Sequence, residues 1–301
     1  MENRSFRSLR IVFAGAVCLF TSAAVAQPDL DWQQVLQRCS DHEHPKPAIL
    51  ACSLILAQKG LNRDGQKGIY ADRGMAYLWD KNYPAAVADF TKVIDLSDKT
   101  SDSGYVLRAN AYAAAGDYDK AFADFGRAIA IDPRDANAYS ARGDAYNDKG
   151  DLAGAHADFM KAGDVASADS PRSGNAITYY DKAAKVDPHD AKAFNGAGRA
   201  WLDAYGDDKE AIPDFDAAIA IDPQYGEAYA NRCVARVLSG SDLPRARADC
   251  DKALALGQDK DARVYYARGL AKQKAGDVTG DADLTIAKAM QPNVAEVFAK
   301  K

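Results

Sequence analysis

The stretch DYDKAFADFGRAIAIDP at residues 117–133 is nearly repeated by AIPDFDAAIAIDP at residues 211–223. In both stretches apolar residues recur at intervals of three and four, which is the spacing of an amphipathic helix. Both stretches end in Asp-Pro, and a helix should end there because proline disfavours helical backbone in the residue before it. This repeated sequence motif predicts a chain built from repeated helical units.

The repeated unit has a small residue, an aromatic residue three positions later, a Gly-Asp turn, the pattern Ala-x-x-Asp-Phe and finally Asp-Pro. We name the helix before the turn helix A and the helix after it helix B. Most of the steps between units are 34 to 36 residues, and the small residue falls at Gly74, Ala109, Gly143, Gly198, Cys233 and Gly269. No single unit can bury its apolar face alone, so neighbouring units must stack into one core.

This pattern resembles the tetratricopeptide repeat (TPR) family, and the resemblance covers most of residues 30–290. It implies an all-α fold, a TPR superhelical solenoid of stacked antiparallel helix pairs. The last two units depart from the family pattern, since Arg236 and Lys272 replace the helix-A aromatic. The chain is also similar to exported bacterial TPR proteins, which carry an N-terminal pair of cysteines.

The N-terminus has the features of a secretory signal peptide, predicted over residues 1–26. Three arginines precede an apolar run at residues 11–20, and an Ala-x-Ala site follows at residues 24–26. The mature chain would begin at Gln27 and lie in a bacterial periplasm or outside the cell. An uncleaved membrane anchor is the alternative. Removal of this segment moves the formal net charge from −5 to −7.

The rest of the chain divides into predicted segments. Residues 27–66 form a degenerate N-terminal helical unit, residues 67–166 form repeats one to three, and residues 191–301 form repeats four to six. The step from Gly143 to Gly198 is 55 residues, which is neither one repeat nor two.

Residues 163–190 should therefore hold an irregular loop plus an extra helix. Residues 163–174 are rich in Ser, Asp and Gly, so we expect a loop or hinge there. The following helix reads as a helix B whose helix A is missing or absorbed into the end of the preceding helix. Two short stacks, at roughly residues 28–166 and 175–301, would meet at this loop.

An arginine precedes the small residue in five units, and an aspartate precedes the helix-B aromatic or its replacement in the same five. The pairs are Arg73 and Asp89, Arg108 and Asp124, Arg142 and Asp158, Arg232 and Asp249, and Arg268 and Asp283. We predict an ion pair between the two helices of each unit; the alternative is two solvated charges. In repeat four Ala197 replaces the arginine, and Arg199 is the candidate substitute partner for Asp214.

Four cysteines follow the signal segment, and an even number in an exported chain suggests disulfides. The resemblance places Cys233 and Cys250 opposite each other on the two helices of one unit. Cys52 takes the same helix-B position in the N-terminal unit, with Cys39 on the preceding helix. We therefore predict the disulfides Cys39–Cys52 and Cys233–Cys250, with reactive or metal-binding thiols as the alternative.

No catalytic motif occurs in the sequence, so we predict neither an enzyme nor a cofactor or metal site. The only local cluster suited to metal binding is Asp41–His44, whose spacing matches no established zinc motif. An enzyme or metal-dependent accessory protein that uses this loop is the alternative function. The acidic balance and the lack of a Lys/Arg block argue against nucleic-acid binding, and no further stretch is apolar enough to span a membrane.

The resemblance implies a concave face, lined mainly by helix A, that binds peptide or protein partners. The candidate groove residues, assigned by family position, are Met75, Leu78, Trp79, Asn110, Asn147, Asn195 and Arg199. The asparagine amides can donate to and accept from a peptide backbone, and the apolar residues could hold side chains. For Leu78 and Trp79 the alternative is a capping contact with the N-terminal unit. The carboxylate clamp of chaperone-binding members is absent, since Ala71 and Met75 stand where its Lys and Asn would be. The predicted function is that of an interaction scaffold or adaptor in the cell envelope.

Overall fold

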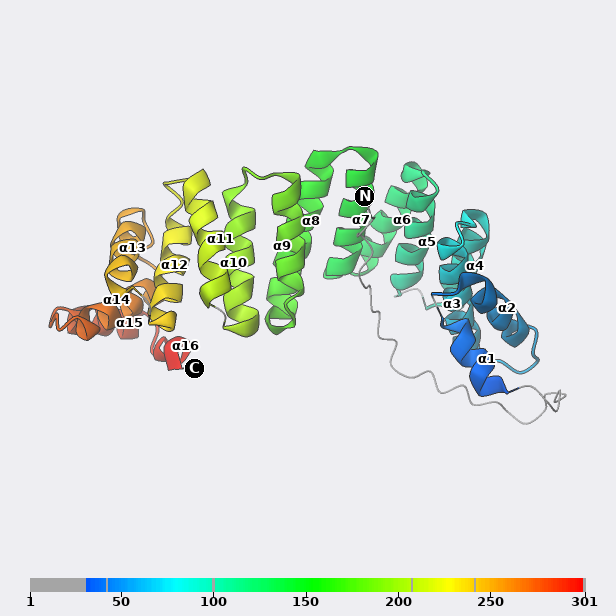
Figure 1. The fold of residues 1–301 in the computed structure, drawn as a ribbon, viewed down its shortest axis with the longest axis horizontal. Coiled ribbons are helices and arrows are strands. Elements are labelled where there is room, and N and C mark those ends of the chain that lie inside the picture. The colour runs from blue at the N-terminus through cyan, green and yellow to red at the C-terminus, as the bar shows by residue number, and fades with distance from the viewer. Residues whose placement is uncertain (1–30, 42, 99–100, 207, 241, 300–301) are drawn as a thin grey trace. The chain divides into compact units, whose positions relative to one another are not determined.

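The computed structural model describes residues 31–41, 43–98, 101–206, 208–240 and 242–299, and this part of the chain contains helices and no strand. Within residues 31–131, and separately within residues 136–290, helices that follow each other along the chain pack side by side (Figure 1). The predicted all-α stack of helix pairs is thus confirmed. The signal peptide predicted over residues 1–26 lies outside the described residues. The chain divides into two compact units, residues 1–132 and 133–301, and each is described by itself.

Unit 1 contains six described helices. They are α1 (Trp32–Cys39), α2 (Pro45–Leu56), α3 (Arg63–Trp79), α4 (Tyr83–Leu96), α5 (Ser103–Ala114) and α6 (Tyr118–Ile131). The first two make up the degenerate N-terminal unit, and the pairs α3–α4 and α5–α6 are the first two regular repeats.

Unit 2 contains ten described α-helices and one short 3₁₀ turn, η1. The elements are α7 (Ala136–Lys149), α8 (Leu152–Asp169), η1 (Pro171–Ser173), α9 (Asn175–Val186), α10 (Ala191–Tyr205), α11 (Asp208–Ile221), α12 (Gly226–Ser239), α13 (Leu243–Ala255), α14 (Ala262–Lys274), α15 (Gly280–Met290) and α16 (Ala295–Ala299). Of these, α7, α10, α12 and α14 are the predicted helix-A segments.

The Gly-Asp turn between the two helices of a unit has a local cause, seen clearly between α7 and α8. Gly150 ends α7 in the left-handed conformation with φ of 85°, which costs glycine no steric strain. The next residue, Asp151, begins α8 by accepting a hydrogen bond from the backbone N–H of Gly154 at 2.9 Å. The dipeptide therefore ends one helix and starts the next.

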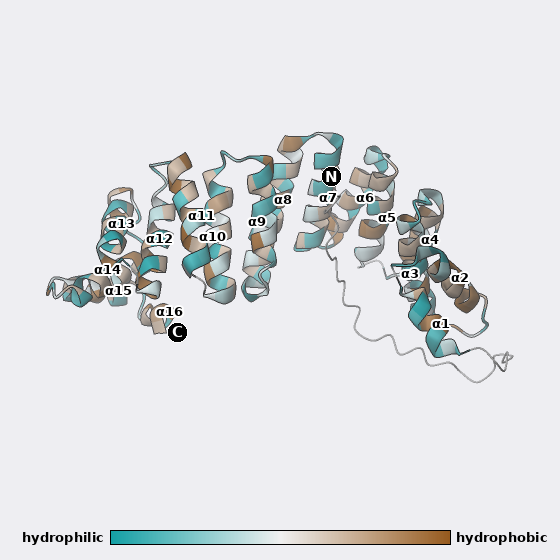
Figure 2. Ribbon diagram, in the orientation of Figure 1, coloured by the Kyte–Doolittle hydropathy of each residue, from teal (hydrophilic) through white to brown (hydrophobic). Residues whose placement is uncertain are grey.

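The small residue of helix A lets the aromatic residue of helix B approach closely. A Cβ atom added at Gly74 would lie 2.5 Å from a ring carbon of Phe90, and one at Gly198 would lie 2.7 Å from Phe215. Both phenylalanine side chains are fully buried. Apolar and hydrophilic segments alternate along individual helices, as amphipathic helices require (Figure 2).

The predicted loop over residues 163–174 is wrong for residues 163–169, which continue α8 as a regular helix. The reason is packing: a Cβ atom at Gly163 would lie 2.6 Å from the ring of Tyr180 on α9. Gly163 is thus the small residue of the missing helix A, which is absorbed into the end of α8. Only the short segment from Ser170 to Gly174 interrupts the helices there. The boundary between the two units falls at Asp132–Pro133, and not at residues 163–174 as expected for the two short stacks.

Candidate functional site

The candidate groove residues lie on four helix-A segments in two units. Met75, Leu78 and Trp79 are on α3, Asn110 is on α5, Asn147 is on α7, and Asn195 and Arg199 are on α10. The first four belong to unit 1 and the last three to unit 2, so the two sets are considered separately.

In unit 1, α3 and α5 contact each other directly. Met75 and Leu78 are half-buried and pack against the core cluster that contains Phe90, while the Trp79 side chain is 48% exposed. Asn110 is half-buried, and no residue in the part of the chain that the structure describes hydrogen-bonds its side-chain amide. We name Met75, Leu78, Trp79 and Asn110 the α3–α5 face.

In unit 2, α8 serves as helix B for α7 and as helix A for α9. Its Phe159 packs against Gly143 of α7, and its Gly163 packs against Tyr180 of α9. Because α8 has both roles, side chains of α9, a helix B, contact α7. In a regular stack the helix A of the next unit would contact α7 instead.

Two side chains of α9 bond to the helix-A face of α7. The Tyr179 hydroxyl donates to Asn137 at 2.9 Å, and Lys182 Nζ lies 2.7 Å from a carboxylate oxygen of Asp144. Asn147, nearer the end of α7, is exposed. The predicted groove therefore does not run uninterrupted from α7 to α10, and Asn147 lies apart from the candidate residues of α10.

Asn195 is a wrong assignment as a groove residue, because only 3% of it is exposed. Its Oδ1 accepts a hydrogen bond from Asn231 at 2.9 Å, and its Nδ2 donates to the Tyr225 hydroxyl at 3.2 Å. Its position lies in the seam between α10 and α12, where buried amides must be paired. Ser140, at the same position relative to Gly143, is buried as well.

Arg199 is exposed, and its guanidinium lies 3.6 Å from the carboxylate of Glu227 on α12. The expectation that it replaces the missing arginine of repeat four is therefore wrong. Asp214 makes no ion pair with any residue in the described ranges.

The predicted Arg–Asp pairs are confirmed in all five units. In each, the arginine Nε and Nη2 atoms donate to the two carboxylate oxygens; for Arg142 and Asp158 the distances are 2.7 and 2.8 Å. The other four pairs are Arg73–Asp89, Arg108–Asp124, Arg232–Asp249 and Arg268–Asp283. The aspartates are buried, which excludes the alternative of two solvated charges.

Sequence reasoning missed the aromatic ring that accompanies each arginine. A tyrosine three residues earlier lies under the guanidinium, with ring centroids 5.4 to 5.8 Å from the arginine Cζ. The tyrosines are Tyr70, Tyr105, Tyr139, Tyr229 and Tyr265. The recurring Tyr-x-x-Arg pattern could have revealed this contact, because residues three apart share a helix face. These groups fix the packing of helix A on helix B.

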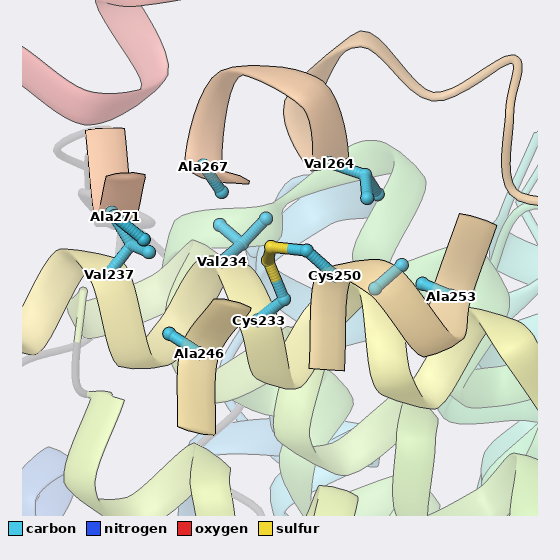
Figure 3. Packing of buried hydrophobic residues seen from close by; sticks show 10 residues of the cluster. Cys233, Val234, Val237, Ala246, Cys250, Ala253, Val264, Ala267 and Ala271 are labelled. Atoms are coloured by element: carbon cyan, nitrogen blue, oxygen red, sulfur yellow. A yellow bond between two sulfur atoms is a disulfide. The ribbon is translucent and has the colours of Figure 1, made fainter. Parts of the chain in front are cut away.

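The cysteines lie in the two predicted pairs. The Cα atoms of Cys39 and Cys52 are 4.8 Å apart and those of Cys233 and Cys250 are 5.3 Å apart, and both pairs lie at disulfide distance. All four are fully buried. Figure 3 shows the bond between Cys233 and Cys250 surrounded by apolar side chains of three helices, where it joins helix A to helix B.

The Asp41–His44 loop holds one described ion pair. Asp41 Oδ2 lies 2.9 Å from His44 Nδ1, and this hydrogen bond lowers the pKa of the Asp41 carboxyl. His42 lies outside the described residues. Among the residues that are described, no group of three or more His, Cys, Asp or Glu side chains is placed to hold a metal ion. Within the same ranges, no helix has both the length and the apolar character needed to span a membrane.

Two family models match the chain. The model described as TPR repeat matches residues 109–162, and the model described as tetratricopeptide repeat matches residues 172–226. The second match begins in η1 and includes α9, the helix without a separate helix A. No curated protein matches the chain.

Several solved structures are similar to the chain. YrrB, a TPR protein with an unusual peptide-binding site, has 18% identity and a TM-score of 0.36, covering 70% of this chain and 96% of its own. The yeast Sti1 TPR2AB domain, in complex with pHSP90, has 17% identity and a TM-score of 0.33, covering 79% and 98%. A tetratricopeptide repeat protein from Parabacteroides merdae has 17% identity and a TM-score of 0.38, covering 89% and 97%. Since these TM-scores lie below 0.5, the family assignment rests on the sequence matches.

Proposed function

The chain belongs to the tetratricopeptide repeat family, and from that premise we propose that the α3–α5 face of unit 1 binds a peptide segment of a partner protein. TPR proteins act as protein–protein interaction scaffolds. In this chain the α3–α5 face would supply the binding surface, through apolar packing and a hydrogen bond to the peptide backbone.

The observation that carries the proposal is the unpaired amide of Asn110. An amide that no protein group bonds is free to hydrogen-bond a ligand. The Asn110 amide has no hydrogen-bond partner among the described residues, and α5, which carries it, contacts α3, which carries the exposed indole of Trp79. A peptide backbone offers both a donor and an acceptor to an amide.

The apolar part of the face supports the same proposal. Met75, Leu78 and Trp79 are spaced i, i+3 and i+4, so they share one side of α3. An exposed tryptophan next to half-buried apolar side chains is typical of a contact that anchors a partner. We therefore propose that an apolar side chain of the peptide packs on Trp79 while its backbone bonds Asn110.

We further propose that the protein acts in the cell envelope. The signal-peptide pattern of residues 1–26 supports this location. The two cysteine pairs at disulfide distance also support it, because such pairs are oxidised mainly in exported proteins.

The test is selection of peptides from a random library displayed on phage, using the mature chain, followed by affinity measurement on single-residue variants. Trp79→Ala should weaken binding at least tenfold, and Asn110→Ala about fivefold, which corresponds to about 1 kcal/mol for one hydrogen bond. Leu152→Ala is the matched control, since Leu152 is 54% exposed but starts a helix-B segment in unit 2. Equal affinities for wild type and both face variants would rule out the α3–α5 face.

A further inference from the structure

Repeat four lacks the arginine that the other regular units place between helix A and helix B. Where five units have an arginine between their helices, repeat four has Ala197. Repeat five shows what that arginine does: Arg232 bonds Asp249 on its own helix B at 2.6 and 2.9 Å, and it bonds Asp216 on the preceding helix B at 2.6 Å. Its guanidinium thus neutralises two carboxylates from two different helices.

Repeat four keeps both carboxylates and lacks the guanidinium. Asp214 on α11 follows Ala197 by the same number of residues as Asp249 follows Arg232. Asp181 on α9 precedes Ala197 by the same number as Asp216 precedes Arg232. Glu210, one helical turn before Asp214 on α11, adds a third acidic group. Asp214 and Asp181 therefore occupy the positions whose counterparts Arg232 bonds in repeat five, Asp249 and Asp216.

The neighbouring cations are bound to other carboxylates. On α12, Arg232 and Arg236 are both held by Asp249 and Asp216. On α10, Arg199 pairs with Glu227. On α9, Lys185 acts on Asp181, and not on Asp214. Within the described part of the chain, no basic group compensates the charge of Asp214.

The burial of Asp214 and its acidic neighbours both disfavour its charged form. Partial burial of Asp214, together with the charges of Asp181 and Glu210, raises the pKa of its carboxyl from 3.8 to about 7. A carboxyl whose pKa is raised by folding stabilises the fold fully below the unfolded value of 3.8. That stability is lost as the pH rises toward and through about 7.

We propose that repeat four is a proton-sensitive joint in unit 2: α10 and α11 pack firmly when Asp214 is protonated and open locally when it is ionised. The five units with an Arg–Asp pair do not share this behaviour, because a guanidinium donates to both oxygens of their aspartate.

Amide hydrogen exchange read by mass spectrometry tests the joint without any ligand, on the whole mature chain. Protection of α10–α11 peptides, corrected for the intrinsic exchange rate, should fall about tenfold from pH 6 to pH 8 relative to α12–α13 peptides. Asp214→Asn should remove this pH dependence, since the amide cannot ionise. Ala197→Arg should also remove it by restoring the cation, whereas Ala197→Met, which adds bulk without charge, should retain it.

The result that would overturn the proposal is equal protection of α10–α11 at the two pH values in the wild-type chain. Persistence of the pH dependence in Asp214→Asn would overturn it as well, because another group would then be responsible. Asp214→Asn is close to isosteric, so it decides the question even where Ala197→Arg fails to fold.

Discussion

Replacing Arg142 by methionine removes one guanidinium and keeps most of the side-chain length. Arg142 donates to both oxygens of Asp158 at 2.7 and 2.8 Å, and its guanidinium lies over the ring of Tyr139. The methionine side chain can keep the apolar contact with the ring. What the variant loses is the charge and the two hydrogen bonds.

The size of the stability loss in Arg142→Met depends on how deeply the remaining partner, Asp158, is buried. The Asp158 side chain is 8% exposed and that of Arg142 is 23% exposed, so the variant leaves a carboxylate in the core without a cation. Breaking a buried ion pair in this way costs about 3–5 kcal/mol. We expect about 3 kcal/mol, at the low end, because the arginine is partly exposed and water can reach the vacated position.

The assay is urea unfolding combined with hydrogen exchange of the α7–α8 peptides, because a stack of repeats need not unfold in one step. A loss of about 3 kcal/mol corresponds to roughly a hundredfold loss of protection. The double variant Arg142→Met with Asp158→Val should recover most of the stability, since no unpaired charge is left buried.

Arg245→Met is the matched control. Arg245 pairs with Asp242 at 3.1 Å, but the two side chains are 75% and 41% exposed, so its loss should cost under 1 kcal/mol. If Arg142→Met costs no more than Arg245→Met, the pair contributes little and the reasoning from burial is refuted.

Two further predictions concern covalent links and packing. Both disulfides should be found in the mature chain by non-reducing peptide mapping, and reduction should cost about 3 kcal/mol for each loop in the chain-entropy model; free thiols or a pairing of Cys39 with Cys250 would contradict this. Gly163→Val should destabilise unit 2 by about 1–3 kcal/mol by overpacking against Tyr180, as judged from urea midpoints. Gly126→Ala on α6, with no atom within 4 Å of the added Cβ, should instead stabilise by roughly 0.5–1 kcal/mol; similar effects of the two substitutions would contradict the double role of α8.

The repeat, the helix pairs and the Arg–Asp pairs could be predicted from the sequence because each depends on residues close along the chain. A helix face is set by three- and four-residue spacing, and the Gly-Asp turn that separates helix A from helix B is a local signal. The pairing of Arg142 with Asp158 follows once those two helices are known to be adjacent.

The double role of α8 could not be predicted in the same way. Residues 163–169 are Gly, Asp, Val, Ala, Ser, Ala and Asp, a composition that favours a loop over a helix. They are helical because Gly163 and Ala166 are buried against α9, and that burial depends on Tyr180, which lies 17 residues after Gly163. Tertiary packing outweighs local propensity here.

For the candidate groove, too, the sequence predicts part of the answer and tertiary packing decides the rest. Sequence position alone placed Asn110, Asn147 and Asn195 on one face, because family position assigns a residue to a side of helix A. Only the packing of α12 on α10 decides that Asn195 is buried and bonded to Asn231, and only the packing of α9 decides which part of α7 is covered. The sequence by itself determined the repeated helix pair, since its signals are local. The tertiary structure decided which side chains remain exposed to a partner, because exposure depends on contacts between units that no local pattern encodes.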